Sequence, residues 1–170
     1  MYIILYVQHC IIYHIRHLHQ GLMETEVIPV TLPAKKGAEP VVVSRDEEFT
    51  NVKYDKVPNL KPAFGKATDG ASVTAANASK LSDGAVAMIL MSGEQAKAKG
   101  LTPLFRILGY SDVCKDPVEF TTAPAEAIPL AIEHANKTTL KNSADKLTLE
   151  KIDYHEINEA FSVVALANAK

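Results

Sequence analysis

The sequence has very few cysteines, with only Cys10 and Cys114 among 170 residues. They lie far apart, and they form neither a disulfide framework nor a pair with the spacing of metal ligands. A reducing compartment is therefore the default expectation. The chain also lacks an excess of either charge, since its net charge is −2 and its lysines and arginines are scattered. This distribution argues against nucleic-acid binding, which would need a basic stripe.

Acidic residues are absent before Glu24, and this sets the first 23 residues apart. The segment holds four of the six histidines, but their spacing is not one known for metal ligands. Its apolar runs, 2–7 and 10–13, are too short for a membrane span, which needs about 20 apolar residues. The basic start and small-residue cleavage site of a signal peptide are also missing. We interpret residues 1–23 as an atypical leader outside the fold; a weak membrane or organelle signal is the alternative.

Apolar residues are well represented: the chain is 47% hydrophobic and 22% charged, the balance of a soluble globular protein. Residues 27–66 hold five of the nine prolines, which indicates a loop-rich excursion. Two short pieces in it, "VIPVTL" and "PVVVS", are typical of strands between charged turns. A loop segment this long inside a compact protein is usually functional.

Strand and helix patterns alternate after that excursion. The continuous apolar run 85–91 predicts a strand that is covered on both faces. Ser92 and Gln95 have the spacing of a capping box, so a helix should begin there. Gly100 is placed to end this helix.

The rest of the chain continues the alternation, with strands predicted at 103–113 and 151–158 and helices at 123–136 and 159–169. The first of these helices has Pro124 at its start, and Pro129 should kink its early turns. Its apolar face is formed by Ile128, Ile132 and Ala135. Alternating strands and helices predict an α/β architecture. Since only four or five strands are convincing, we expect a sheet that is cut at both ends.

A polar cluster precedes the last predicted helix and consists of Asp153, His155, Glu156, Asn158 and Glu159. Asn158 lies at the carboxyl end of the predicted strand, where open α/β sheets bind ligands. The residues alone leave two interpretations open. In the first, Asn158 caps the helix and Glu159 complements its dipole. In the second, the junction presents the amide to a substrate or a water.

Two motifs, "NEAF" at 158–161 and "TAANASKLSDGA" at 74–85, resemble the thiolases, and most closely the acetyl-CoA acetyltransferases, also called acetoacetyl-CoA thiolases. The resemblance runs from residue 26 to the end of the sequence. It implies an α/β, thiolase-like fold, in which 24–101 is the end of the N-terminal domain with its loop region. Residues 102–170 would then be the start of the C-terminal domain, and the chain an internal fragment.

The resemblance implies an acyltransferase that forms or cleaves acetoacetyl-CoA through a cysteine, with acetyl-CoA and acetoacetyl-CoA as substrates and no covalent cofactor. Asn158 matches the family's asparagine, which holds a water that donates to a thioester oxygen; a neutral amide suits this task. The nucleophile's segment and the G-H-P and C-x-G motifs of the family do not occur in the sequence. Cys10, Cys114 and His155 do not match them, so we expect the chain to be inactive alone.

Coenzyme A binding is implied first for Ser79, which matches the serine that hydrogen-bonds the pantetheine arm; an ordinary turn serine is the alternative. Four more positions align near the CoA nucleotide: Asn51, Val52, Lys53 and Lys56. Lys56 fits a phosphate contact, whereas Asn51 and Lys53 depart from the family pattern. A solvated loop is the alternative for both lysines.

Potassium is implied as a further ligand, because relatives with this motif bind it through backbone carbonyls that match Ala75, Ala76 and Ala78. The remaining potassium ligands of the family lie outside this chain.

Full-length relatives are homo-oligomers, and the compartment, mitochondrial or cytoplasmic, stays open. The alternative functions are a non-catalytic CoA-binding or interaction module and a degradative 3-ketoacyl-CoA thiolase. A generic nucleotide-binding domain would need a GxGxxG turn, which does not occur.

Overall fold

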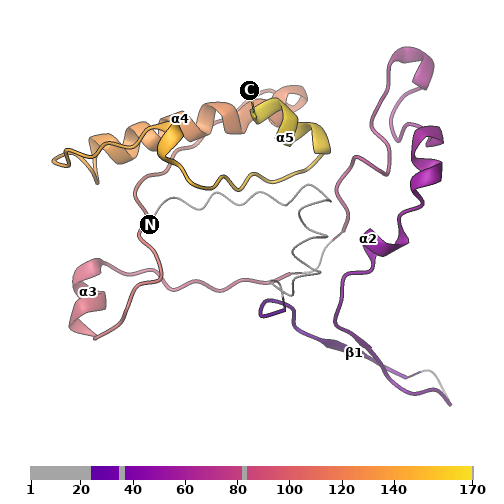
Figure 1. The fold of residues 1–170 in the computed structure, drawn as a ribbon, viewed down its shortest axis with the longest axis horizontal. Coiled ribbons are helices and arrows are strands. Elements are labelled where there is room, and N and C mark those ends of the chain that lie inside the picture. Colours follow the sequence, from indigo (N-terminus) through magenta and orange to yellow (C-terminus); the bar gives the residue numbers. More distant parts are fainter. Residues whose placement is uncertain (1–23, 35–36, 82–83, 170) are drawn as a thin grey trace. The chain divides into compact units, whose positions relative to one another are not determined.

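The computed structural model describes residues 24–34, 37–81 and 84–169 (Figure 1). The sequence segment interpreted as a leader therefore lies outside the described residues. The chain divides into two compact units. Their described residues are 24–76, the N-terminal unit, and 77–169, the C-terminal unit.

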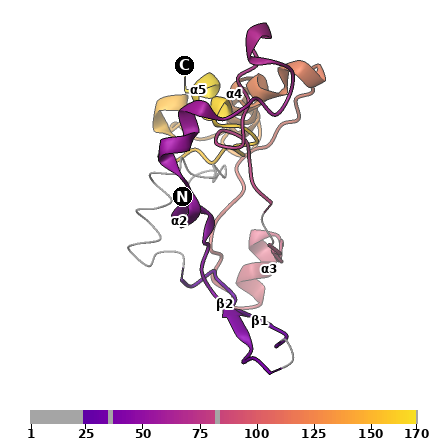
Figure 2. The ribbon, with the colours of Figure 1, turned by 90° about the vertical axis from the view of Figure 1, so that its right-hand side faces the viewer.

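The N-terminal unit begins with a β-hairpin (Figure 2). Strand β1, Val30–Leu32, pairs antiparallel with β2, Val41–Val43, so that Val30 faces Val43 and Leu32 faces Val41. These strands lie in the two pieces for which the sequence predicts strands, and that prediction is confirmed. All six side chains are exposed. A two-stranded hairpin with no buried face is marginally stable by itself.

Short helical turns fill the rest of this unit: α2, Glu48–Asn51; η1, Tyr54–Asn59; and η2, Ala67–Asp69. The last turn ends at Gly70, whose φ of 79° is the left-handed conformation that glycine adopts without a steric penalty. The predicted loop-rich character of residues 27–66 is confirmed, since a short hairpin and short helical turns are the regular structure here.

The C-terminal unit contains the helix α3, Gly93–Ala98, which the capping signal predicts. The Ser92 hydroxyl accepts a hydrogen bond from the Gln95 N–H at 3.2 Å, which satisfies one of the unpaired donors at the start of the helix. Gly100 follows with a φ of 64°. The predicted start and end of this helix are both confirmed.

Helix α4, Ala123–Lys137, is the longest helix of the described chain, and the sequence predicts it to within one residue. It follows a 3-10 turn, η3, Pro117–Thr122. A further 3-10 turn, η4, Leu149–Lys151, precedes the last helix, α5, Ser162–Asn168. Helix α5 packs against η3.

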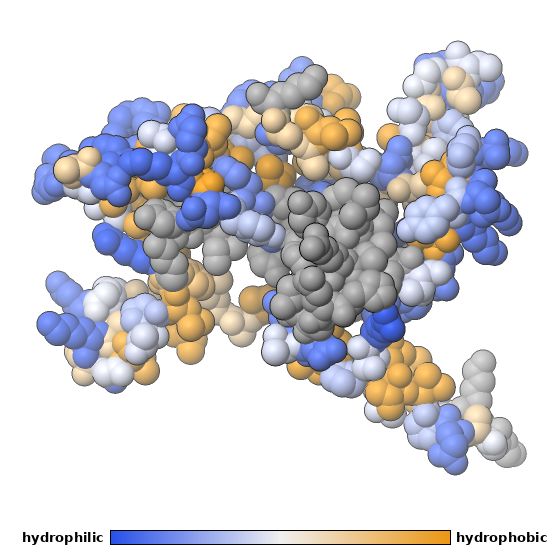
Figure 3. Space-filling view, in the orientation of Figure 1, coloured by the Kyte–Doolittle hydropathy of each residue, from blue (hydrophilic) through white to orange (hydrophobic). Residues whose placement is uncertain are grey.

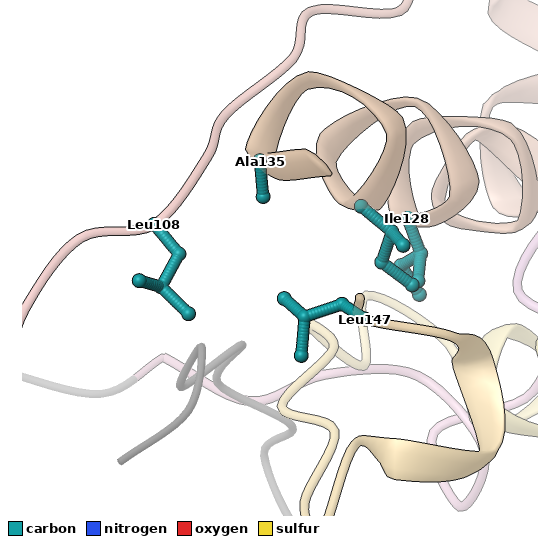
Figure 4. Packing of buried hydrophobic residues seen from close by; sticks show 5 residues of the cluster. Leu108, Ile128, Ala135 and Leu147 are labelled. Atoms are coloured by element: carbon teal, nitrogen blue, oxygen red, sulfur yellow. The ribbon is translucent and has the colours of Figure 1, made fainter. Parts of the chain in front are cut away.

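The core of this unit lies beneath the apolar face of α4 (Figure 4). Ile128 and Ala135 point from the helix toward Leu108 and Leu147, which come from loops, and Ile132 belongs to the same buried cluster. The Asn136 side chain fixes Leu147 by accepting from its N–H at 2.9 Å and donating to its carbonyl oxygen at 2.8 Å. The predicted apolar face of this helix is therefore confirmed.

Three predicted strands, 85–91, 103–113 and 151–158, are not formed in the structure. A strand requires a neighbouring strand to take its backbone hydrogen bonds. Among the described residues, the one sheet is the β1–β2 hairpin, and these segments are not part of it (Figure 1). The side chains of Val86 and Ile89 are 91% and 85% exposed. The expectation that 85–91 is covered on both faces was therefore wrong for this chain.

Candidate active site

Two segments far apart in the sequence meet in the C-terminal unit. The N–H of Ser79 donates to the carbonyl oxygen of Ala160 at 3.1 Å, and the N–H of Ser162 donates to the carbonyl oxygen of Asn77 at 3.0 Å. Together they make an isolated antiparallel bridge centred on Ala78 and Phe161. We call the paired segments 77–79 and 160–162 the bridge. It joins the first sequence motif to the second.

The start of the last helix bears on one of the two interpretations of Asn158, the capping interpretation. Helix α5 begins at Ser162, because the backbone of the preceding residues is extended and takes part in the bridge. The N-cap residue is Phe161, with a φ of −140° and a ψ of 153°. Asn158 does not cap the helix, and Glu159 lies outside its first turn. The capping interpretation was therefore wrong.

Asn158 and Ser79 are both exposed, and they lie in or next to the two paired segments of the bridge. Ser79 is itself a bridge residue, and Asn158 lies two residues before Ala160. An exposed amide and an exposed hydroxyl on adjoining backbone segments are groups that a polar, extended ligand could contact together. The structure thus brings together the segments that carry these two predicted site residues.

An aromatic contact supports the bridge from the side of η3. The rings of Phe120 and Phe161 are tilted by 56°, and their centroids are 6.0 Å apart, within the range for a favourable aromatic pair. Asn168, at the end of α5, donates to the carbonyl oxygen of Thr121 at 2.8 Å. Both ends of the helix are therefore held against η3.

A charged pair fixes η3 to the first turn of α4. The Lys115 ammonium lies 2.6 Å from the Glu126 carboxylate and donates to the Thr122 hydroxyl at 2.9 Å. The hydrogen bond with Glu126 raises the pKa of Lys115 above its ordinary value. Lys115 is therefore charged at neutral pH and ties these elements together.

The other residues of the polar cluster divide by burial. Glu156 is buried, with 6% of its surface exposed, and His155 is half-buried. The sequence pattern of the polar cluster did not indicate that Glu156 would be its buried member. Cys114 is a free, exposed cysteine. Cys10 lies outside the described residues.

The predicted nucleotide contacts lie in the N-terminal unit, around the junction of α2 and η1. Asn51 ends α2, Val52 is half-buried, and the carbonyl oxygen of Lys53 accepts from the Lys56 N–H at 2.9 Å. The side chains of both lysines are exposed. These four residues lie in one short stretch of the N-terminal unit.

The predicted potassium ligands divide between the units, with Ala75 and Ala76 ending the N-terminal unit and Ala78 in the bridge. Across the described ranges, the His, Cys, Asp and Glu side chains do not gather into a group of three or more that could hold a metal ion. The potassium site would use backbone carbonyl oxygens instead, and it stays a prediction. The described helices include none that combines the length and apolar character of a membrane span.

Comparison with known families accounts for both motifs. The family model of the thiolase N-terminal domain matches residues 16–94, and that of the thiolase C-terminal domain matches residues 101–170. The chain belongs to the thiolase family. The two matched regions contain the two bridge segments, one in each region.

Individual relatives agree with this assignment. A Dictyostelium discoideum protein named "Probable acetyl-CoA acetyltransferase" is 48% identical over 150 residues, which cover 88% of this chain and 33% of the relative. A Xenopus laevis protein named "Acetyl-CoA acetyltransferase B, mitochondrial" is 45% identical over 150 residues, with the same coverage of both chains. This thiolase chain thus spans about a third of the length of the curated relatives it matches.

A solved structure extends the likeness to the fold. The crystal structure of the Bacillus anthracis acetyl-CoA acetyltransferase superimposes with a TM-score of 0.73 at 37% identity, covering 93% of this chain and 36% of that one. The predicted fold class, thiolase-like α/β with a partial N-terminal and a partial C-terminal domain, is confirmed.

Proposed function

We propose that this chain carries part of the active site of an acetyl-CoA acetyltransferase, an enzyme that forms or cleaves acetoacetyl-CoA by acyl transfer through a cysteine. The observation that carries the proposal is the bridge, because its backbone hydrogen bonds hold Ser79 beside the segment of Asn158. The names of the relatives supply the substrate class, acetyl-CoA.

Asn158 is proposed to hold a water whose hydrogen bond stabilises negative charge on the thioester oxygen. The side-chain amide can donate a hydrogen bond to a water or accept one from it, and it adds no charge of its own. Fixed donors that point toward a developing oxyanion typically contribute a factor of about 10²–10³ to the rate. The exposure of Asn158 leaves its amide accessible for this role.

Ser79 is proposed to hydrogen-bond the pantetheine arm of CoA. The small residues around it, Ala76 and Ala78, allow a narrow ligand to approach the backbone closely. In the same proposal Lys56 pairs with a CoA phosphate, and Asn51, Val52 and Lys53 border the nucleotide. Potassium, on the carbonyl oxygens of Ala75, Ala76 and Ala78, and assembly into homo-oligomers are further parts of this proposal.

The test of CoA binding is calorimetric titration of the 170-residue chain with acetyl-CoA. Ser79→Ala should weaken binding, whereas Ser44→Ala, which removes an exposed hydroxyl from the N-terminal unit, should not. Asn158→Ala should be compared with Asn142→Ala, which truncates an exposed amide away from the bridge. Equal affinity of the Ser79 and Ser44 variants would contradict the proposed pantetheine contact.

Catalysis by this chain alone is not expected, because the sequence contains no G-H-P or C-x-G motif and neither cysteine matches the nucleophile. CoA-dependent cleavage of acetoacetyl-CoA by the purified chain, above the level of Asn158→Ala, would contradict this. A second candidate function, a CoA-binding module without chemistry, predicts acetyl-CoA binding but no turnover. A degradative thiolase, which accepts substrates with a broader range of acyl chain lengths, would instead bind longer acyl-CoA esters as well as it binds acetyl-CoA.

A further inference from the structure

The hydrogen-bond pattern of the bridge makes Ala78 and Phe161 a directly opposed pair. The two backbone bonds run from residues on either side of this pair, Ser79 to Ala160 and Ser162 to Asn77. Such a pair is of the non-hydrogen-bonded type, whose Cα atoms are about 4.5 Å apart and whose side chains approach more closely than in the other type. Both side chains are half-buried. The small methyl group of Ala78 therefore leaves room for the neighbouring aromatic ring.

Phe161 is in turn held by elements outside both motifs. Its ring packs against Phe120 on η3, and η3 is tied to α4 through Lys115. At the other end of α5, Asn168 donates to the carbonyl oxygens of Thr121 and Val164. Residues 160–162 are thus held both by the bridge and by contacts with η3.

We propose that Phe161 is a positioning residue, whose ring, anchored on Phe120, holds the bridge closed and so sets the separation between the Ser79 hydroxyl and the Asn158 amide. This inference rests on the proposed function, in which those two groups contact the same thioester ligand and their separation therefore matters. A misplacement of about 1 Å between groups that bind one reactant can cost about 10²-fold in rate. A backbone bridge anchored by an aromatic ring is a means of preventing such a displacement.

The first test needs no ligand and measures amide hydrogen exchange on the 170-residue chain. In Phe161→Ala, the exchange of the Ser79 and Ser162 N–H groups should rise together by about tenfold or more, because both bonds depend on the same anchor. Phe161→Tyr keeps the ring and should retain the protection. Phe64→Ala, which removes an exposed ring in the N-terminal unit, is the matched control and should leave both rates unchanged.

Two N–H groups away from the bridge separate positioning from a general loss of structure. Gln95, bonded to Ser92, and Leu147, bonded to Asn136, should keep their protection in Phe161→Ala. Unchanged exchange at Ser79 and Ser162, or an equal loss of protection at Leu147, would overturn the inference.

The second test uses acetyl-CoA and nuclear magnetic resonance. In the unaltered chain, the backbone amide of Ser79 and the side-chain amide of Asn158 should shift with one apparent dissociation constant. In Phe161→Ala, the Ser79 signal should still shift, while the Asn158 signal should lose its response. If the two signals still respond together in Phe161→Ala, as in the unaltered chain, the inference is overturned. If acetyl-CoA shifts neither signal in the unaltered chain, the proposed function fails, and hydrogen exchange still decides whether Phe161 closes the bridge.

Discussion

At the scale of single residues, Gly109 controls how closely the chain approaches α4. A Cβ atom at this position would lie 2.4 Å from the carbonyl oxygen of Ala131 and 2.8 Å from the backbone nitrogen of Ala135. Both are backbone atoms of a helix and cannot move away easily. Only glycine therefore allows Leu108 to enter the core beneath this helix.

Gly109→Ala should lower the free energy of unfolding by about 1–3 kcal/mol, the usual cost of overpacking. The measurement is urea unfolding followed by circular dichroism. Gly93→Ala is the matched control, because a Cβ atom there meets nothing within 4 Å and the residue begins a helix, where alanine is favoured. Equal stability of the two variants would contradict the close packing at Gly109.

Asn136 illustrates a second single-residue effect, since its side chain satisfies both backbone groups of the buried Leu147. Asn136→Ala should cost about 1–3 kcal/mol, because it leaves a half-buried donor and acceptor unpaired. Unfolding curves and the exchange rate of the Leu147 N–H would measure it. Asn142→Ala, on an exposed turn, should change neither quantity.

At the scale of elements, the outcome of the sequence predictions follows the range of the interactions involved. The helices α3 and α4 were predictable, because a capping serine, a glycine in the left-handed conformation and an apolar repeat act within one element. Strands were predicted at 85–91 and 151–158 but are not formed, because strand formation depends on a partner strand that the local pattern does not specify. For the same reason, the last helix begins later than the predicted residue 159, because Phe161 takes part in the bridge.

The candidate site shows the same division. Ser79 and Asn158 were identified from motifs, through resemblance to a family. Their connection through Ala78 and Phe161 could not be predicted, because it consists of backbone hydrogen bonds between distant segments.

The cap of α3 gives a prediction at this scale. Ser92→Ala should destabilise the helix by about 0.5–2 kcal/mol, because the Gln95 N–H loses its acceptor. Hydrogen exchange at Gln95 should accelerate, while exchange at Leu147, in another part of the same unit, should not. Ser92→Asp keeps an acceptor and should preserve the protection of Gln95; a rise in exchange there would count against the capping bond.

The tie between η3 and α4 should depend on pH. The pKa of Lys115 is raised by its hydrogen bond to Glu126, so the charged form is favoured in the folded state. Its contribution to stability is present below the unfolded value of 10.5 and is lost as the pH rises through the higher folded value. A titration of the Lys115 side chain by nuclear magnetic resonance should show the raised pKa, and Glu126→Gln should return it toward 10.5.

At the scale of the whole molecule, the exposed apolar side chains determine how the chain behaves in solution. Hydrophobic atoms flank α3 in Figure 3, where the preceding and following segments run. Val86, Ile89 and Leu104 are each at least 85% exposed. The backbone beside them belongs to no sheet among the described residues, and an extended, exposed apolar segment of this kind favours association with other chains.

We therefore expect the purified 170-residue chain to associate in a concentration-dependent manner, as measured by sedimentation velocity. Ile89→Lys should reduce the association, because a charge in an unpaired strand-like segment opposes pairing with another chain. Leu166→Lys places the same charge on α5, at an apolar residue that is 70% exposed, and should have the smaller effect. A monomer at all concentrations, with a sharp cooperative thermal transition, would show that these apolar segments are covered in solution and that the unpaired chain is not a source of association.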